Sequence, residues 1–291
     1  MWTPIAEEAE QAARVLHPDG HALPRPAHCR ILTIANQKGG VGKTTSAVNL
    51  AAALAAYGMR VLVIDLDPQG NASTALGVEH SSGTPSIYEA LIGEISLLDA
   101  VRRSTQSPDL LCVPATIDLA GAEIELVSMV ARESRLQQAL SDRVVAELDV
   151  DYVLIDCPPS LGLLTVNALV AAAEVLIPIQ CEYYALEGLG QLLNNIELVR
   201  AHLNTDLQVS TILLTMYDGR TKLADQVTSE VREHFGDRVL RTVIPRSVKV
   251  SEAPGYGQTV LAYDPGSRGA MSYLDAAREI VEDQERVESG R

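Results

Sequence analysis

The chain has 291 residues and a formal net charge of −15, which argues against a protein coated in basic residues for holding nucleic acid. Hydrophobic residues make up 47% of the chain but aromatic residues only 4%, so the core must consist of Ala, Val, Leu and Ile, as is typical of parallel strands covered by helices. The four cysteines form no CxxC pair and no apolar run is as long as a membrane span, so we expect a soluble protein of the reducing cytoplasm without zinc, disulfides or a membrane helix.

The first 28 residues are predicted to be separate from the rest of the chain. A short helical pattern from Ile5 to Leu16 is followed by prolines and glycines that prevent regular structure up to Pro26. We therefore expect an N-terminal arm and linker over residues 1–28 and a single domain over residues 29–291. The arm is too short to form an independent helix-turn-helix domain.

Short apolar runs alternate with longer helical patterns from Arg30 onward, and Gly58 is predicted to end the first of the helices. This alternation predicts an α/β fold with a doubly wound, mostly parallel sheet and helices on both faces. Ligands of such sheets bind beyond the carboxyl ends of the strands. The predicted strands are Ile31–Asn36, Val61–Asp65, Leu110–Pro114, Tyr152–Asp156, Val175–Ile179, Val209–Leu214 and Val239–Ile244, and the predicted helices include Thr44–Tyr57, Gly162–Ala172, Leu186–Leu203 and Thr221–Phe235.

A glycine-rich segment, QKGGVGKTT from Gln37 to Thr45, directly follows the first predicted strand and precedes a helix. Glycines allow backbone N–H groups to point at phosphate oxygens, and the helix adds the positive end of its dipole. Lys43 is expected to reach the β and γ phosphates of ATP, and the Thr44 hydroxyl is expected to bind Mg²⁺. The segment therefore predicts a P-loop ATPase.

This segment departs from the standard pattern GxxxxGK[ST], which requires glycine where the chain has Gln37. Lys38 stands at the next position instead. The pattern KGGxGK[ST] is the deviant Walker A sequence of the superfamily that includes ParA, MinD and the nitrogenase iron protein. The resemblance implies that Lys38 reaches across a dimer interface to the nucleotide of the partner. The residues expected to contact ATP here are Lys38, Gly39, Gly40, Val41, Gly42, Lys43, Thr44 and Thr45.

The second predicted strand ends in Asp65 and is followed by Leu66 and Asp67. Because side chains alternate along a strand, Asp65 and Asp67 share one face at its carboxyl end, where the phosphates would lie. We expect Asp67 to orient the attacking water or sense the γ-phosphate, and to take part in Mg²⁺ binding. The sequence Asp-Pro-x-Gly is also an ordinary turn, and the spacing alone leaves that alternative open.

The strand Tyr152–Asp156 also ends in a carboxylate, in the arrangement of a Walker B motif. Asp156 is therefore expected to bind Mg²⁺, either directly or through water. Cys157 follows, but it is not predicted to be a nucleophile or a redox group. No histidine pattern accompanies it, and neighbouring carboxylates raise the pKa of a thiol.

Several longer segments resemble the ParA (Soj) chromosome- and plasmid-partition ATPases. The resemblance covers residues 30 to 280 and includes segments that MinD-type relatives do not share, above all PRSVKVSEAP. The segments are ANQKGGVGKTT from Ala35, VIDLDPQGN from Val63, DCPPSLG from Asp156, MYDGRT from Met216, VIPRSVKVSEAPGYGQTV from Val243 and YDPGSRGAMSYLDAA from Tyr263.

This resemblance implies an ATP-driven sandwich homodimer that binds double-stranded DNA without sequence preference and is associated with the nucleoid. A ParB-like centromere-binding partner would stimulate ATP hydrolysis and release the DNA, which segregates a chromosome or plasmid. The resemblance also implies catalytic roles for Lys38, Lys43 and Asp67.

The same resemblance implies DNA contacts by Arg220 and Lys249, and an adenine contact by Pro245 and Arg246, of which Arg246 could serve DNA instead. The stretch Arg200–Arg268 carries nine Lys and Arg against eight Asp and Glu, so a local basic face can exist on an acidic chain. An evenly mixed, solvated surface is the alternative.

Two other functions share the P-loop. A MinD-like ATPase that cycles on and off membranes needs a basic amphipathic C-terminal helix, whereas Asp275–Arg291 carries six acids and three arginines. An iron-sulfur or amidoligase-like enzyme is the second alternative. Cys112 and Cys157 lack the glycine-rich surroundings expected of cluster ligands. Both alternatives are therefore disfavoured.

Overall fold

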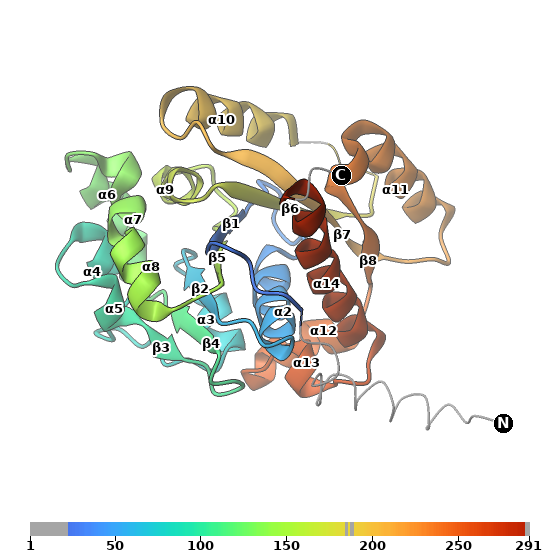
Figure 1. Cartoon of the computed structure of the whole chain (residues 1–291), viewed down its shortest axis with the longest axis horizontal. Helices are drawn as coiled ribbons and strands as arrows, with labels where there is room; N and C mark the ends of the chain where they lie inside the picture. The colour runs from blue at the N-terminus through green and yellow to red at the C-terminus, as the bar shows by residue number, and fades with distance from the viewer. Residues whose placement is uncertain (1–22, 184–185, 187–188, 289–291) are drawn as a thin grey trace.

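The structure, a computed structural model, describes residues 23–183, 186 and 189–288 (Figure 1). In these residues one strand pair of the sheet is antiparallel and all other pairs are parallel, which confirms the predicted α/β sheet. In spatial order the eight strands are β3 (Arg102–Arg103), β4 (Leu110–Val113), β2 (Val61–Asp65), β5 (Tyr152–Asp156), β1 (Arg30–Ile34), β6 (Glu174–Gln180), β7 (Gln208–Tyr217) and β8 (Val239–Pro245).

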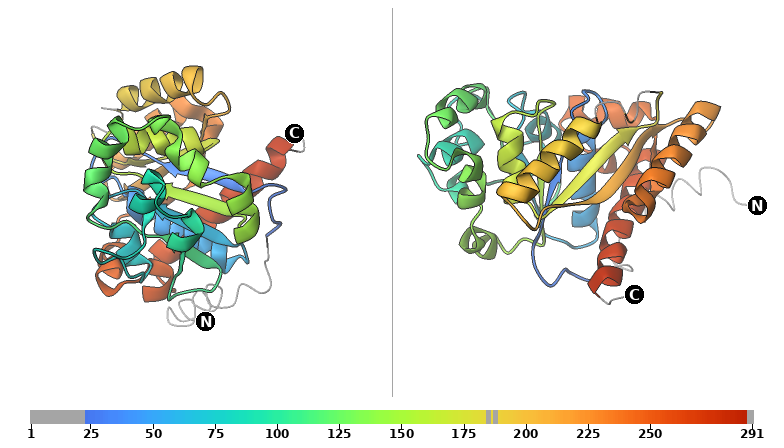
Figure 2. Two further views of the ribbon diagram at one scale, coloured as in Figure 1. Left: turned by 90° about the vertical axis from the view of Figure 1, so that its left-hand side faces the viewer. Right: turned by 90° about the horizontal axis from the view of Figure 1, so that it is seen from above.

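Helices cover both faces of this sheet, as Figures 1 and 2 show. One face is covered by α2 (Lys43–Ala56), α3 (Asn71–Ala75), α12 (Val248–Glu252), α13 (Val260–Tyr263) and α14 (Arg268–Glu288). The other is covered by α4 (Ile87–Ile92), α5 (Leu97–Ala100), α6 (Leu119–Val127), α7 (Arg135–Ala139), α8 (Asp142–Leu148), α9 (Leu163–Ala171), α10 (Leu189–His202) and α11 (Lys222–Phe235). Three 3₁₀ turns in the described residues are η1 (Arg132–Ser134), η2 (Gly236–Arg238) and η3 (Ala253–Tyr256).

Two hydrophobic cores lie on opposite sides of the sheet because successive strand residues point to opposite faces. On β2, Val61 and Val63 belong to the core beneath α2 and α14, whereas Leu62 and Ile64 belong to the core beneath α4 to α11. All five residues of β2 are buried. The central strands are thus fixed from both sides, and their carboxyl ends meet at one edge of the sheet.

The seven predicted strands all occur, with shifts of one to three residues at their ends. The two-residue strand β3 has no predicted counterpart because two residues carry no alternating pattern. Gly58 follows α2 with a φ of +85°, as predicted for a residue that ends this helix. The predicted helix over 186–203 corresponds to α10, although residues 187 and 188 lie outside the described part.

The predicted N-terminal arm lies largely outside the described residues, including its helical pattern over 5–16. Residues 23–28 are described and run along the amino ends of the strands. There Arg25 lies 3.7 Å from Asp151, and Leu23 packs against the core beneath α2. The division between an arm over 1–28 and a domain over 29–291 stays a prediction. No helix in the described part of the chain has both the length and the apolarity needed to cross a bilayer.

Candidate functional site at the carboxyl edge of the sheet

The loop between β1 and α2 contains the glycine-rich segment. Gly40 and Gly42 have φ angles of +74° and +89°, which residues with a side chain rarely adopt. A Cβ atom added at Gly39 or Gly40 would meet no described atom within 4 Å. The backbone therefore curves around open space at the start of a helix, as expected for a loop that binds phosphate.

Two side chains outside the predicted loop residues hold the loop in place. Asn36, at the end of β1, accepts a hydrogen bond from the Lys38 N–H (3.0 Å) and donates one to the Pro178 carbonyl (2.8 Å). The buried hydroxyl of Thr215 on β7 donates to the Val41 carbonyl (2.8 Å). The sequence predicts neither role. Asn36 is recognisable as a polar residue that ends an apolar strand, whereas no sequence signal distinguishes Thr215.

Lys43 is the first residue of α2 and is 7% exposed. Its Nζ donates to the Lys38 carbonyl over 3.4 Å. Burial lowers the pKa of Lys43, whereas the nearby Asp156, Cys157 and Asp67 act to raise it. The structure thus brings Lys43 together with Asp156 and Asp67, as the sequence predicts. A bound anion beside this buried lysine would favour its charged form.

Asp65 and Asp156 end the adjacent strands β2 and β5, are paired in register, and are both fully buried. Asp65 accepts hydrogen bonds from the Ser73 N–H (2.9 Å), the Ser73 hydroxyl (2.7 Å) and the Asp67 N–H (3.2 Å). Burial raises the pKa of Asp65 to about 6, although the bonds from Ser73 and Asp67 oppose that rise. Asp65 is therefore occupied in holding the loop over 67–73.

Asp156 differs from its neighbour because neither of its buried carboxylate oxygens accepts a hydrogen bond from the described residues. Burial, and then the charge of Asp65, raises the pKa of Asp156 well above its ordinary value, and the positive charge of Lys43 opposes the rise. A buried carboxylate without a partner is costly in a folded protein. A cation bound at this point would offset that cost.

The residues around Asp156 fit a magnesium ion. Mg²⁺ is usually bound by one or two carboxylates together with phosphate oxygens and water. Asp156 supplies an unpartnered carboxylate, and the half-buried Thr44 at the start of α2 supplies a hydroxyl. Thr44 and Asp156 therefore would hold Mg²⁺ beside the phosphates of a nucleotide.

Asp67 forms the turn that the sequence left open as an alternative. Its Oδ1 accepts the Gln69 N–H (3.0 Å), and its carbonyl accepts the Gly70 N–H (2.9 Å). The turn keeps the half-buried carboxylate close enough to Lys43 to influence its pKa. The turn is therefore real, and roles of Asp67 in hydrolysis and in Mg²⁺ binding stay predictions.

The cysteines of this region are buried. Cys112 and Cys157 are 0% and 1% exposed, and burial is the main cause of a raised pKa for both thiols. For Cys157 the charge of Asp156 raises the pKa further. A thiol with a raised pKa stays protonated and is a poor nucleophile and metal ligand.

The predicted basic residues lie at the same edge of the sheet, after the carboxyl ends of β7 and β8. Tyr217 pairs in register with Pro245, and the Arg246 N–H donates to the Tyr217 carbonyl (2.9 Å). The side chains of Arg220, Arg246 and Lys249 are 87%, 58% and 50% exposed. The edge that carries the phosphate loop therefore also carries three accessible cations, and Pro245 ends β8 directly before Arg246.

On β7, Met216 lies between a residue that holds the phosphate loop and a residue next to the basic edge. Its φ is +52°, in the left-handed region that residues with a long side chain rarely adopt. Thr215, which holds the phosphate loop, precedes Met216, and Tyr217 follows it. The pairing of β7 with β8 is irregular between Leu214 and Tyr217. The strand is therefore strained where it passes from the phosphate loop to the basic edge.

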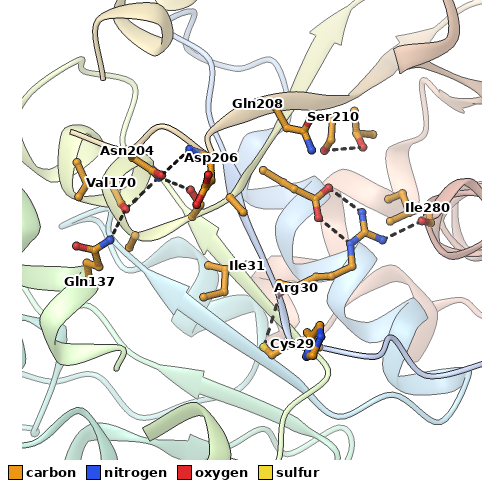
Figure 3. A pocket seen from close by; sticks show the side chains of 16 residues that line it. Cys29, Arg30, Ile31, Gln137, Val170, Asn204, Asp206, Gln208, Ser210 and Ile280 are labelled. Atoms are coloured by element: carbon orange, nitrogen blue, oxygen red, sulfur yellow. Dashed lines mark hydrogen bonds and ion pairs between the residues drawn. The ribbon is translucent and has the colours of Figure 1, made fainter. Parts of the chain in front are cut away.

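A cavity of about 510 Å³ lies at the opposite, amino edge of the sheet (Figure 3). Two of its charged groups are paired with each other: Arg30 donates to both carboxylate oxygens of Glu174 at 2.7 Å, and it also donates to the Ile280 carbonyl at 3.0 Å. The Asn204 amide donates to carbonyls of the 169–172 segment. This cavity is lined by groups that stabilise the fold, and it is not our candidate site.

Comparison with known proteins extends these observations. A family model described as an AAA domain matches residues 29–209. The chain is 54% identical over 252 residues to the sporulation initiation inhibitor protein Soj of Bacillus subtilis, an alignment that covers 87% of this chain and 98% of Soj. It is 53% identical to the chromosome partitioning protein ParA of Caulobacter vibrioides, over 87% of this chain and 94% of that protein.

Among solved structures, cobyrinic acid a,c-diamide synthase from Mycobacterium smegmatis with bound ADP and magnesium is similar, with a TM-score of 0.76 and 38% identity. That likeness covers 91% of this chain and 97% of the synthase. It shows that the same fold holds a nucleotide and magnesium in the synthase.

Proposed function

Because this chain belongs to the Soj/ParA family of chromosome-partitioning ATPases, we propose that it uses ATP to switch a homodimer between a DNA-bound and a DNA-free state. The observation that carries the proposal is the unpartnered carboxylate of Asp156 beside an open glycine loop. ATP with Mg²⁺ supplies the phosphates and the cation that this arrangement lacks. Relatives that are 49% to 53% identical to this chain are named for chromosome partitioning, which favours this function over that of an amidoligase.

The phosphate loop would bind ATP through its backbone N–H groups and through Lys43. Gly39 and Gly40 face open space, and Val41 and Gly42 complete the loop before α2. Thr44 and Thr45 lie in the first turn of α2, whose positive end would face the phosphates. Mg²⁺, when bound, neutralises phosphate charge, and Thr44 and Asp156 would hold it. We propose that Asp67 also takes part in binding this ion.

Two further residues complete the proposed hydrolysis site. Asp67, held by its turn near Lys43, would orient the attacking water. Lys38, whose N–H is fixed by Asn36, would extend its ammonium to the nucleotide of the partner subunit. ATP would thus join two protomers, and hydrolysis would separate them.

The basic edge would bind DNA. Arg220 and Lys249 are exposed cations, and we propose that they contact DNA phosphates, which position a protein on DNA without reading its sequence. Pro245 ends β8 and Arg246 follows it, and we propose that they contact adenine, with Arg246 able to serve DNA instead. Two protomers double a surface that is weak alone, because the second contact becomes effectively intramolecular. A ParB-like partner would accelerate the release, and the dimer would reside on the nucleoid.

The C-terminal helix α14 bears on the membrane-cycling alternative. Among the side chains that the structure describes on this helix, Tyr273, Leu274, Ile280 and Val281 are buried inside the fold, in the core shared with α2. A helix that binds a membrane needs such side chains on a free face. We therefore propose DNA rather than a membrane as the surface on which the dimer cycles.

DNA binding measured with no nucleotide, ADP, ATP and a non-hydrolysable ATP analogue tests this proposal. We expect binding with ATP and with the analogue, little binding with ADP, and affinity that falls steeply with salt on unrelated sequences. Arg220→Glu should remove DNA binding while light scattering still shows the ATP-dependent dimer. Equal binding in all four nucleotide states would contradict the proposed switch.

A further inference from the structure

Each of the three cations at the basic edge has a carboxylate partner within the same protomer. Arg220 lies 2.7 Å from Asp218, Arg246 lies 2.8 Å from Glu182, and Lys249 lies 3.7 Å from Glu252. Three carboxylates of the same protomer therefore pair with the three cations.

The pairs are also connected to one another. The hydrogen bonds and the charge of Arg220 lower the pKa of Asp218 to about 2, and the charge of Arg246 acts in the same direction. Lys249 additionally lies over the Tyr263 ring, 5.5 Å from its centroid. The three cations and their three carboxylates have a summed charge of zero.

We propose that Asp218, Glu182 and Glu252 compete with DNA phosphates for these cations, so that one protomer alone presents a face with almost no attraction for DNA. The inference rests on the proposed DNA-binding function and gives it a regulatory element. An exposed ion pair is weak, so phosphates can displace the carboxylates. The displaced carboxylates then remain near the phosphates and repel them, which keeps affinity low until a dimer doubles the contacts.

Asp218 offers the cleanest test. Asp218 is 24% exposed and interacts with the exposed Arg220 through both carboxylate oxygens. Its Oδ1 also accepts the Arg220 N–H (3.1 Å), which forms a local turn. Asparagine keeps an oxygen for this turn and loses the charge, so Asp218→Asn changes the electrostatics with little change of backbone.

Glu197 provides a matched control at another place. It is exposed and forms an ion pair with Arg200 at 3.3 Å. It lies on α10 beside a second cavity, which is different from that of Figure 3 and lies at the amino end of β7. Glu197→Gln changes the net charge of the chain by the same amount as Asp218→Asn. A difference between the two variants therefore reports the position of the charge.

Fluorescence anisotropy of a labelled DNA duplex, with the full chain and a non-hydrolysable ATP analogue at several salt concentrations, tests the inference. We expect Asp218→Asn to bind about threefold more tightly than wild type at low salt, from the loss of one charge close to a phosphate. Glu197→Gln should match wild type, and the effect should shrink as salt rises.

Weaker binding by Asp218→Asn would show that Asp218 orients Arg220 for DNA, and binding equal to that of Glu197→Gln would show that the carboxylate does not compete. Either result overturns this inference and leaves the proposed DNA binding intact. Failure of wild type and Asp218→Asn alike to bind DNA would overturn the proposed function and this inference together.

Discussion

The two edges of the sheet treat buried charge in opposite ways. At the amino edge, Arg30 and Glu174 satisfy each other beside a large cavity. At the carboxyl edge, Asp156 has no hydrogen-bond donor among the described residues, and the glycine loop faces open space. The comparison teaches that the ligand site is marked by polar groups without partners, and that the size of a hollow is a poorer guide.

The largest effect on the difference between the two edges is expected from removing Lys43, the buried cation of the carboxyl edge. Lys43→Ala should lower ATPase activity by about 10²- to 10³-fold, because a positive charge aimed at the phosphates is lost. Isothermal titration should show that nucleotide binding is lost as well. Asp67→Ala is the matched variant, since it should slow hydrolysis while ATP stays bound. Retained ATP affinity in Lys43→Ala would refute the site assignment.

The amino edge should show the reverse behaviour, with a cost in stability and none in ATP binding. Glu174→Gln leaves the Arg30 guanidinium, at 12% exposure, without its carboxylate, and should lower the free energy of unfolding by about 3 kcal/mol. Urea unfolding measures the stability and titration measures the ATP affinity. A loss of ATP affinity in the folded variant would indicate that the two edges are not independent.

The carboxyl edge should gain stability when its unpartnered charge is removed. Asp156→Asn should raise the free energy of unfolding without nucleotide by about 2 kcal/mol, because a buried charge is replaced by a neutral group of similar shape. The same variant should lose Mg²⁺-dependent ATPase activity. Thermal unfolding with and without Mg²⁺ and ATP measures both effects. A variant less stable than wild type without nucleotide would mean that Asp156 supports the fold.

A buried carboxylate with partners, Glu279 on α14, sharpens the contrast. Glu279 accepts the N–H groups of Arg241 (2.6 Å) and Thr242 (3.0 Å) and is 6% exposed. Burial would raise its pKa, but these bonds prevail and lower it, so the carboxylate stabilises the folded state above its unfolded pKa, and this contribution is lost as pH falls through the folded value.

Glu279→Gln should therefore cost about 1.5 kcal/mol of unfolding free energy at pH 7. The gap between variant and wild type should narrow as pH falls below the ordinary value of 4.5 for a glutamate. Unfolding curves at several pH values measure the gap. A gap that is constant with pH would indicate a loss of packing and not of charge.

The sequence predicts the fold, and the position of the glycine loop and the two strand-end carboxylates within it, because these signals are local. The glycine loop is contiguous, and the apolar runs before Asp65 and Asp156 place both carboxylates at one edge. The sequence does not distinguish the two carboxylates, since the donors that occupy Asp65 come from Ser73 in a turn. Equally, Glu182 and Arg246 are paired across 64 positions, a separation at which no sequence pattern indicates contact.

Met216 has a left-handed backbone conformation, and it lies on β7 where the phosphate loop and the basic edge adjoin. This conformation is locally unfavourable, so the local preference of the residue conflicts with the fold. A single residue in this conformation costs of the order of 1–3 kcal/mol, which the well-packed remainder of the strand must outweigh. The neighbouring Thr215 is fastened to Val41, so this strained joint cannot relax without disturbing the loop. The phosphate loop and the basic edge are consequently connected through one strained residue, Met216, whose conformation is kept at a cost in local stability.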